Sequence, residues 1–411
     1  MAKSIVINAE VLFDGKRRLN NVSVVVENDR IAEIGKKKQK ADFSGVITPA
    51  FIDAHSHIGM ARFGEPGAED EANDISDQFL PINDPLNSVY FDDLAFREAV
   101  DFGVLYSCIV PGSGNLLGGR AMIIKNFAQN RKEALVKDYG YKMALGYNPR
   151  STGEWKGQRP NTRMGVYGML EKKFEGVLLK RRKAELAREK KLKELDIKVR
   201  SGEKKVNRDD IEFEKKAIER EFTMEFDCEE KALLELLEGH KTAKVHVHKE
   251  DDVLFLISLA KRYGLKVTAD HLGDVHHREI FDELAANGIP VVYGPLGSLP
   301  YKVELKNESY RHAELLMKSR AQYGLMTDHP VILTPALRDS LKFFLIFGMK
   351  EEEAISLITL KNAAILGIDD VLGSLEPGKL ASLTVWDKNP LQLAAYPRMV
   401  MAEGKVLRKG M

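Results

Sequence analysis

The sequence of 411 residues carries 62 basic and 61 acidic side chains, a formal net charge of +1, which argues against a nucleic acid or a membrane surface as its partner. This length exceeds what one hydrophobic core usually organises, so we expect a large domain and a smaller one. The sequence has only two cysteines, which excludes a disulfide framework. No apolar run is long enough to span a bilayer, and together these features predict a cytoplasmic protein.

Short stretches at both ends of the chain alternate apolar and polar residues, a pattern typical of strands joined by hairpins. They lie at 4–8, 22–26 and 30–34 near the start, and at 382–386, 399–401 and 405–407 near the end. Two β-rich ends around a long middle predict one small domain closed by both termini. We assign a β-sandwich domain to residues 1–48 and 370–411.

The middle of the chain, residues 49–369, alternates short apolar runs with helical stretches. After the first strand, which ends near residue 57, the runs lie at 104–110, 121–124, 142–145, 244–247, 266–269, 290–293 and 324–326. Strands separated by helices imply a parallel sheet. The strand–helix unit repeats about eight times, which is the number found in a closed barrel. The predicted fold is α/β, a (β/α)8 TIM-like barrel.

A charged segment at about 170–237 interrupts this pattern with Lys, Arg and Glu at helical spacing. The composition predicts long solvent-exposed helices inserted between barrel strands. A basic helix also suits an anionic partner, but the interleaved Glu residues favour an exposed hairpin or a contact between copies in a homo-oligomer.

The first barrel strand ends in two histidines, His55 and His57. Side chains at positions i and i+2 of a strand share a face, so both imidazoles are able to reach one metal. They would do so at the C-terminal rim of the barrel, where barrel enzymes carry out their chemistry. A chance pair on a surface strand is the alternative, and the apolar run with Asp53 before the pair favours the metal.

Three later strands end in residues of the same kind. His246 and His248 share a face of one strand, His271 ends the next, and Asp328 follows the last short run. Taken singly, each is more often a strand-end residue satisfied by hydrogen bonds than a ligand. Four such strand ends in this order favour a metal site.

Rim loops supply the candidate substrate contacts. Asn148, Arg150 and Arg163 follow the fourth-strand run, and Lys302 follows the seventh. An Arg in such a loop suits a substrate carboxylate through a bidentate pair, and a purely structural role is the alternative. The glycine-rich segment 111–119 lacks the pattern of a phosphate-binding loop, so we interpret it as a loop over the barrel mouth.

These motifs together resemble the amidohydrolase superfamily, within its imidazolonepropionase-like and prolidase-like group. The segment Pro49 to His57 resembles the family's opening phrase, and Ser374 to Lys379, Ser-Leu-Glu-Pro-Gly-Lys, resembles its closing phrase. The stretch 364–367 resembles the family's helix ending. The resemblance covers nearly the whole chain and implies a metal-dependent hydrolase.

The resemblance also implies individual roles. His55 and His57 match the first-strand ligands, and Asp328 matches the last-strand Asp that binds metal and carries protons. His271 matches the sixth-strand ligand, which stabilises the developing oxyanion. For the fifth strand we prefer His246, because a small or aliphatic residue follows it as in the family, and His248 then lines the site.

The number and kind of metals depend on one lysine. Lys142 resembles the fourth-strand Lys that some members carboxylate to bridge two metals, and an unmodified Lys142 implies one. Three imidazoles and a carboxylate suit Zn²⁺, with Mn, Fe and Co as alternatives.

The implied reaction is hydrolysis of a carbon–nitrogen bond in a small molecule, an amide, a cyclic amide or a dipeptide. A deaminase is the alternative among enzymes, but Lys249 stands where deaminases have a Glu, although Glu250 is adjacent. A non-catalytic scaffold relative would lack ligands, and this sequence retains the whole set.

Overall fold

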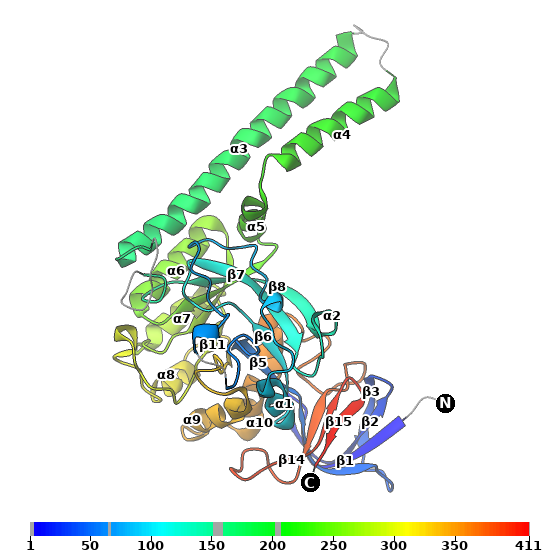
Figure 1. Ribbon diagram of the computed structural model, residues 1–411. Coiled ribbons are helices and arrows are strands. Elements are labelled where there is room, and N and C mark those ends of the chain that lie inside the picture. Colours follow the sequence, from blue (N-terminus) through cyan, green and yellow to red (C-terminus); the bar gives the residue numbers. More distant parts are fainter. Residues whose placement is uncertain (1–3, 65–66, 151–158, 202–206, 411) are drawn as a thin grey trace.

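The computed structural model describes residues 4–64, 67–150, 159–201 and 207–410. The chain forms two sheets, and a pair of long helices projects from the larger one, away from the smaller one (Figure 1). Among the described residues, no helix is long and apolar enough to cross a membrane.

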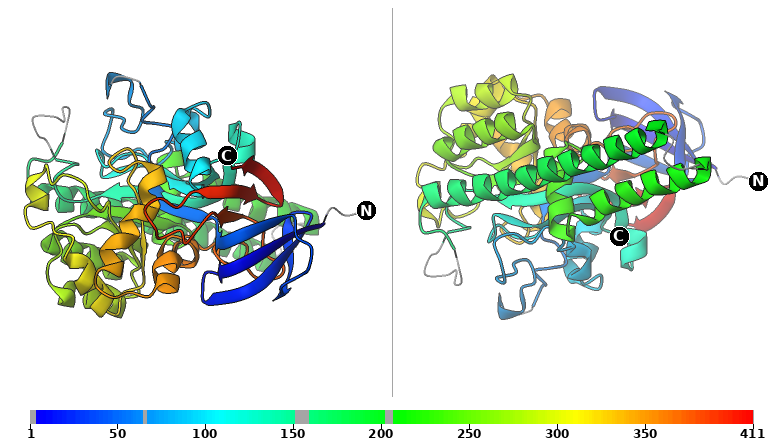
Figure 2. Two further views of the ribbon diagram at one scale, coloured as in Figure 1. Left: turned by 90° about the horizontal axis from the view of Figure 1, so that it is seen from below. Right: turned by 90° about the horizontal axis from the view of Figure 1, so that it is seen from above.

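Both chain ends contribute to one seven-stranded sheet, of order β15-β14-β13-β4-β1-β2-β3. Strand β13 pairs antiparallel with β4, so the C-terminal strands extend the N-terminal sheet through hydrogen bonds (Figure 2). The expected sandwich is therefore one continuous sheet, because the free edge of β4 accepts the returning chain. Its strands are β1 (Ser4–Phe13), β2 (Arg18–Glu27), β3 (Arg30–Lys36), β4 (Phe43–Pro49), β13 (Leu383–Trp386), β14 (Pro397–Ala402) and β15 (Lys405–Lys409).

The second sheet has eight strands in sequence order and is nearly closed into a barrel. Backbone hydrogen bonds near the strand ends join its two edges. The amide of Asp328 donates to the carbonyl of His55, and the amide of His57 donates to the carbonyl of His329, both at 3.0 Å. The strands are β5 (Phe51–Ser56), β6 (Val104–Ile109), β7 (Leu117–Lys125), β8 (Leu135–Ala144), β9 (Thr242–Val247), β10 (Lys266–His271), β11 (Val291–Tyr293) and β12 (Tyr323–Leu325).

One strand departs from the expected parallel barrel. Strand β7 runs antiparallel to both β6 and β8. The loop 110–116 that joins β6 to β7 holds no helix, and the link from β7 to β8 holds only the four-residue α2 (Arg131–Ala134). Such short links cannot carry the chain back along the sheet, so these neighbours pair antiparallel.

The remaining helices pack around the barrel or next to one another, as the contacts of α6 with β10 and of α11 with β5 and β12 show. They are α1 (Leu94–Asp101), α6 (Glu250–Tyr263), α7 (Arg278–Ala286), α8 (His312–Lys318), α9 (Lys342–Leu345), α10 (Glu351–Leu357) and α11 (Leu360–Leu366). Short 3-10 turns lie at η1 (Gly67–Glu69), η2 (Pro85–Asn87), η3 (Val303–Leu305) and η4 (Thr334–Leu341).

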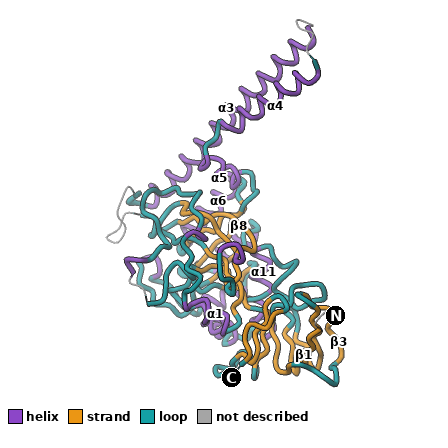
Figure 3. Tube along the Cα trace, turned by 45° about the vertical axis from the view of Figure 1, so that its right-hand side comes forward, coloured by secondary structure: helices purple, strands orange, loops and turns teal. Residues whose placement is uncertain are grey.

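The charged segment forms helices between β8 and β9, as its composition predicts. They are α3 (Arg163–Ser201), α4 (Arg208–Met224) and α5 (Cys228–Leu237), and α3 with α4 makes the projecting hairpin (Figure 3). Ion pairs such as Arg188 to Glu219 at 3.3 Å join the two helices. The precise domain boundaries proposed from the sequence stay predictions.

Candidate metal centre

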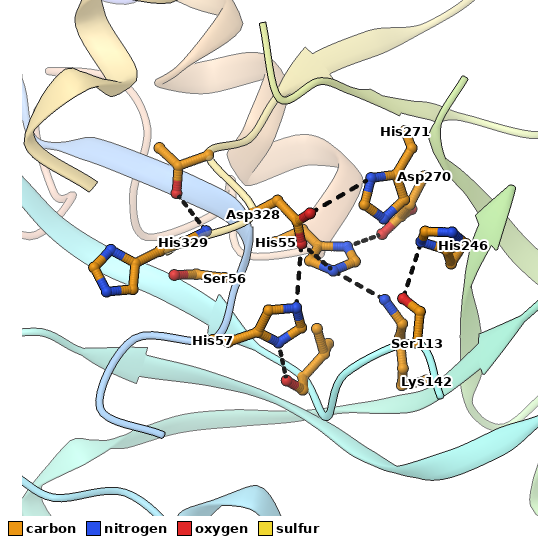
Figure 4. A network of polar contacts seen from close by, with 12 residues as sticks. His55, Ser56, His57, Ser113, Lys142, His246, Asp270, His271, Asp328 and His329 are labelled. Carbon is orange, nitrogen blue, oxygen red and sulfur yellow. Dashed lines mark hydrogen bonds and ion pairs between the residues drawn. The ribbon is translucent and has the colours of Figure 1, made fainter. Parts of the chain in front are cut away.

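Five barrel strands bring the candidate residues to one place. His55 lies on β5, Lys142 on β8, His246 on β9 and His271 on β10, while Asp328 follows β12. Figure 4 shows their side chains pointing toward one another. His271 belongs to two groups of potential metal ligands. One group contains His271 with His55 and Asp328, and the other contains His271 with His246 and His248. Within each group the ligand atoms lie within 4.8 Å of one another.

The ring of His55 is fully buried and held from both sides. Its Nδ1 donates to Oδ2 of Asp270 at 2.7 Å, so Nε2 carries the lone pair. That Nε2 lies 2.9 Å from Nζ of Lys142 and 3.5 Å from Oδ1 of Asp328. Burial, and then the charge of Lys142, lowers the pKa of His55 to about 3. The ring is therefore neutral, the form that binds a metal.

The Nε2 atom of His57 faces the carboxylate of Asp328, and a positive charge between them would stabilise this arrangement. Its Nδ1 donates to the carbonyl of Val110 at 2.7 Å, which leaves the lone pair on Nε2 of the neutral ring. Nε2 lies 3.1 Å from Oδ1 of Asp328. Two acceptors at this distance repel each other, so either a second proton on the ring or a metal ion between them is required.

The second group holds buried nitrogens without partners. The rings of His246 and His271 have centroids 4.1 Å apart, and those of His248 and His271 4.9 Å. Both nitrogens of His271, Nε2 of His246 and Nδ1 of His248 make no hydrogen bond within the described part of the chain. Unpaired buried polar atoms are costly, so the donor set fits a divalent metal. Burial is the main cause that lowers the pKa of each ring, so all three are neutral.

Two ligand candidates have a backbone conformation that is uncommon for residues with a side chain. The φ angles of His271 and Asp328 are 84° and 52°. Such left-handed conformations cluster at functional sites, because the surrounding packing must hold them in place. Here they turn the ends of β10 and of the segment after β12 into the common centre.

Four residues to which the sequence interpretation assigned no role support the centre. Asp270 accepts from His55 and pairs with the buried Lys244 at 3.0 Å. The hydroxyl of Ser113 contacts Nδ1 of His246 at 2.9 Å, and Oε1 of the buried Glu304 lies 3.7 Å from Nε2 of the same ring. The alternation that places His246 and His248 on one face of β9 also places Lys244 there, a signal available in the sequence. No local pattern pointed to Ser113 or Glu304.

The predicted substrate contacts divide into two groups. His248 joins the histidine cluster, and Lys302 is largely buried with Nζ 3.8 Å from Oε1 of Glu304, close to the cluster. Arg163 instead pairs with Asp251 at 2.7 Å on a half-exposed surface. Asn148 is half-buried, and the guanidinium of Arg150 lies 5.4 Å from the centroid of the neighbouring Tyr147 ring. The substrate roles of all five stay predictions.

The family model described as the amidohydrolase family matches residues 169–407, more than half of the chain. The chain belongs to the amidohydrolase family. An amidohydrolase crystal structure from Thermotoga maritima MSB8 superposes with a TM-score of 0.84 and 29% identity, covering 98% of this chain and 100% of that one. The fold is therefore that of an amidohydrolase.

Two curated proteins are similar to this amidohydrolase over part of their length. Amidohydrolase tasK of Hapsidospora irregularis is 26% identical over 373 residues, which cover 87% of this chain and 36% of that protein. An imidazolonepropionase of Acinetobacter baumannii is 30% identical over 159 residues, 36% of this chain and 38% of that protein. The matched part of the chain thus spans little more than a third of either relative.

Proposed function

We propose that this amidohydrolase is a metal-dependent hydrolase that cleaves a carbon–nitrogen bond in a small amide, cyclic amide or dipeptide. One observation carries the proposal. Buried imidazole nitrogens from three strands converge with the carboxylate of Asp328, and several of them have no hydrogen-bond partner among the residues that the structure describes. Such a donor set suits Zn²⁺, with Mn, Fe and Co as alternatives.

His55, His57 and Asp328 would hold one ion, and, if Lys142 is carboxylated, His246 with His271 would hold a second. A bound divalent ion lowers the pKa of water from about 15.7 to about 7 and so supplies hydroxide at neutral pH. Asp328 would accept the proton of the attacking water through Oδ1 or Oδ2 and return it to the leaving nitrogen. His271 would stabilise the oxyanion that develops on the scissile carbonyl.

Lys142 decides between one and two ions. Its amine is fully buried, and burial lowers its pKa to about 8, so a minor fraction of the amine is neutral at pH 7 and the fraction grows above that pH. The neutral amine attacks CO₂, forming an N–C bond and releasing one proton, and the resulting carbamate carries two oxygens. Those oxygens would bridge two ions, whereas an unmodified Lys142 leaves one.

A deaminase is the second candidate, and Glu304 is the observation that favours it. Its carboxyl lies near His246 and is buried, and burial raises its pKa above the usual range. A carboxyl with a raised pKa is suited to move protons between water and a leaving nitrogen. Release of free ammonia distinguishes a deaminase from a hydrolase that releases an amine or a cleaved ring.

Elemental analysis of protein purified without chelator tests the proposal. We expect one or two equivalents of metal per chain and loss of metal in His55→Ala. We expect no loss in His240→Ala, whose exposed ring pairs with Glu238 and lies just before β9, at the opposite end of that strand from His246. Two equivalents that fall in Lys142→Ala indicate the carbamate bridge. A chain that takes up no metal even after reconstitution with Zn²⁺ would refute the proposal and favour a non-catalytic scaffold.

A further inference from the structure

A cavity of about 330 Å³ opens beside His271, between the loops that follow β10 and β11. It is lined by His271, Gly273, Tyr293, Glu308, Tyr310 and Phe343, among others. Ligand pockets commonly begin at about 300 Å³, so the cavity has room for a small substrate group. Because His271 belongs to both the cavity and the metal centre, a molecule held at the centre is able to extend into this space.

Gly273 lines the cavity and leaves it open by having no side chain. A Cβ at this position would lie 3.3 Å from Nδ1 of His248, 3.3 Å from Cδ2 of Leu305 and 3.6 Å from the carboxyl carbon of Glu308. The missing side chain thus leaves a gap between an imidazole nitrogen and a carboxyl. A ligand atom in that gap would meet both polar groups.

Both of these polar groups lack a partner. Oε2 of Glu308 and Nδ1 of His248 are buried and make no hydrogen bond to any residue that the structure describes. Burial, and then the charge of Asp274, raises the pKa of Glu308 to about 7, while Lys302 acts in the opposite direction. Asp274 itself accepts from the backbone amide of Asn307 at 2.7 Å. Among the described residues, Oε2 of Glu308 therefore has no hydrogen-bond donor for its charged form, although the cation Lys302 is nearby.

Aromatic rings complete the wall around Glu308. Tyr310 and Phe343 have ring centroids 6.1 Å apart, and Tyr293 is buried at the end of β11. Aromatic faces attract cations, and a carboxylate forms its strongest hydrogen bonds with charged donors. A neutral apolar group would fill the cavity equally well but would leave the Glu308 carboxylate unpaired.

We propose that this cavity binds a protonated amine or a guanidinium of the substrate, with Glu308 as the specificity-determining acceptor. The inference rests on the proposed function and narrows its substrates to amides or dipeptides with a basic side group. The ammonium or guanidinium would donate to Oε2 of Glu308 and lie against Tyr310 and Phe343.

Calorimetric titration of the full-length, metal-containing protein with n-pentylammonium and with n-pentanol tests the inference, because neither probe is hydrolysed. We expect the ammonium to bind about 10- to 100-fold more tightly, the range of a hydrogen bond to a charged group. Glu308→Gln should abolish this difference, while Glu314→Gln on α8, whose exposed carboxylate pairs with Lys318, should keep it. Gly273→Ala, which fills the gap, should weaken ammonium binding without removing Glu308.

Hydrolysis of Gly-Lys and Gly-norleucine, and of Lys-Gly and norleucine-Gly, separates this inference from the proposed function. Faster cleavage of either lysine peptide supports both. A retained ammonium preference with no hydrolysis of any amide would overturn the proposed function alone. Equal affinity for the two probes, or an ammonium preference that persists in Glu308→Gln, would overturn the inference.

Discussion

Replacing Asp270 by Asn tests how the protein holds His55 in place. Oδ2 of Asp270 accepts from Nδ1 of His55 at 2.7 Å and pairs with Nζ of Lys244 at 3.0 Å, and all three side chains are fully buried. Burial alone would raise the pKa of Asp270, but Lys244 and then His55 hold it below its usual range. The carboxylate is therefore charged at neutral pH, and it keeps the proton of His55 on Nδ1.

The neutral Asn leaves the charge of Lys244 buried without a counter-ion. Breaking a buried pair in this way costs about 3–5 kcal/mol of unfolding free energy. Loss of the carboxylate behind a metal-binding imidazole should also lower metal affinity by about 10- to 100-fold. Urea unfolding measures the first effect, and competition with a chelator of known Zn²⁺ affinity measures the second.

The double variant Lys244→Met with Asp270→Asn separates the two effects. It removes both charges, so most of the lost stability should return, but metal affinity should stay low because no carboxylate fixes the tautomer of His55. Unchanged unfolding midpoints in the single variant, or metal affinity restored by the double variant, would refute this reasoning.

Three further outcomes are expected. The raised pKa of Glu308, about 7 in the folded state, means that the wild type loses stability as the pH rises from 4.5 through 7. Thermal melts should therefore show Glu308→Gln more stable than the wild type above pH 7 and about equal to it near pH 4. Ser113→Ala should lower Zn²⁺ affinity several-fold in the chelator assay, because Nδ1 of His246 loses its 2.9 Å contact. Replacing 180–225 by a short Gly-Ser linker should leave metal content unchanged, because the two ends of the replaced segment come close together, with Nζ of Lys180 5.8 Å from the centroid of the Phe226 ring. Loss of metal would show that the hairpin supports the barrel.

Local patterns predicted much of this protein because they depend on neighbouring residues. The strands at both chain ends, the runs that became β5, β6 and β8 to β12, and the charged helices α3 and α4 follow from period-two alternation and from helical spacing of Lys, Arg and Glu. The antiparallel strand β7 was assigned to a parallel sheet, because a short apolar run does not specify its direction. The length of the link between two neighbouring strands specifies whether they run parallel or antiparallel.

The sequence by itself predicted an eight-stranded, barrel-like sheet and the strand ends that carry His246, His271 and Asp328. It also paired His55 with His57, because residues two apart on a strand must share a face. Only the tertiary structure decided which groups meet across strands. Asp270 lies behind His55, and Glu308 stands beside His248 across the gap at Gly273. Contacts of this kind join residues far apart in the chain, and no local periodicity encodes the distance between two strands once the sheet has closed.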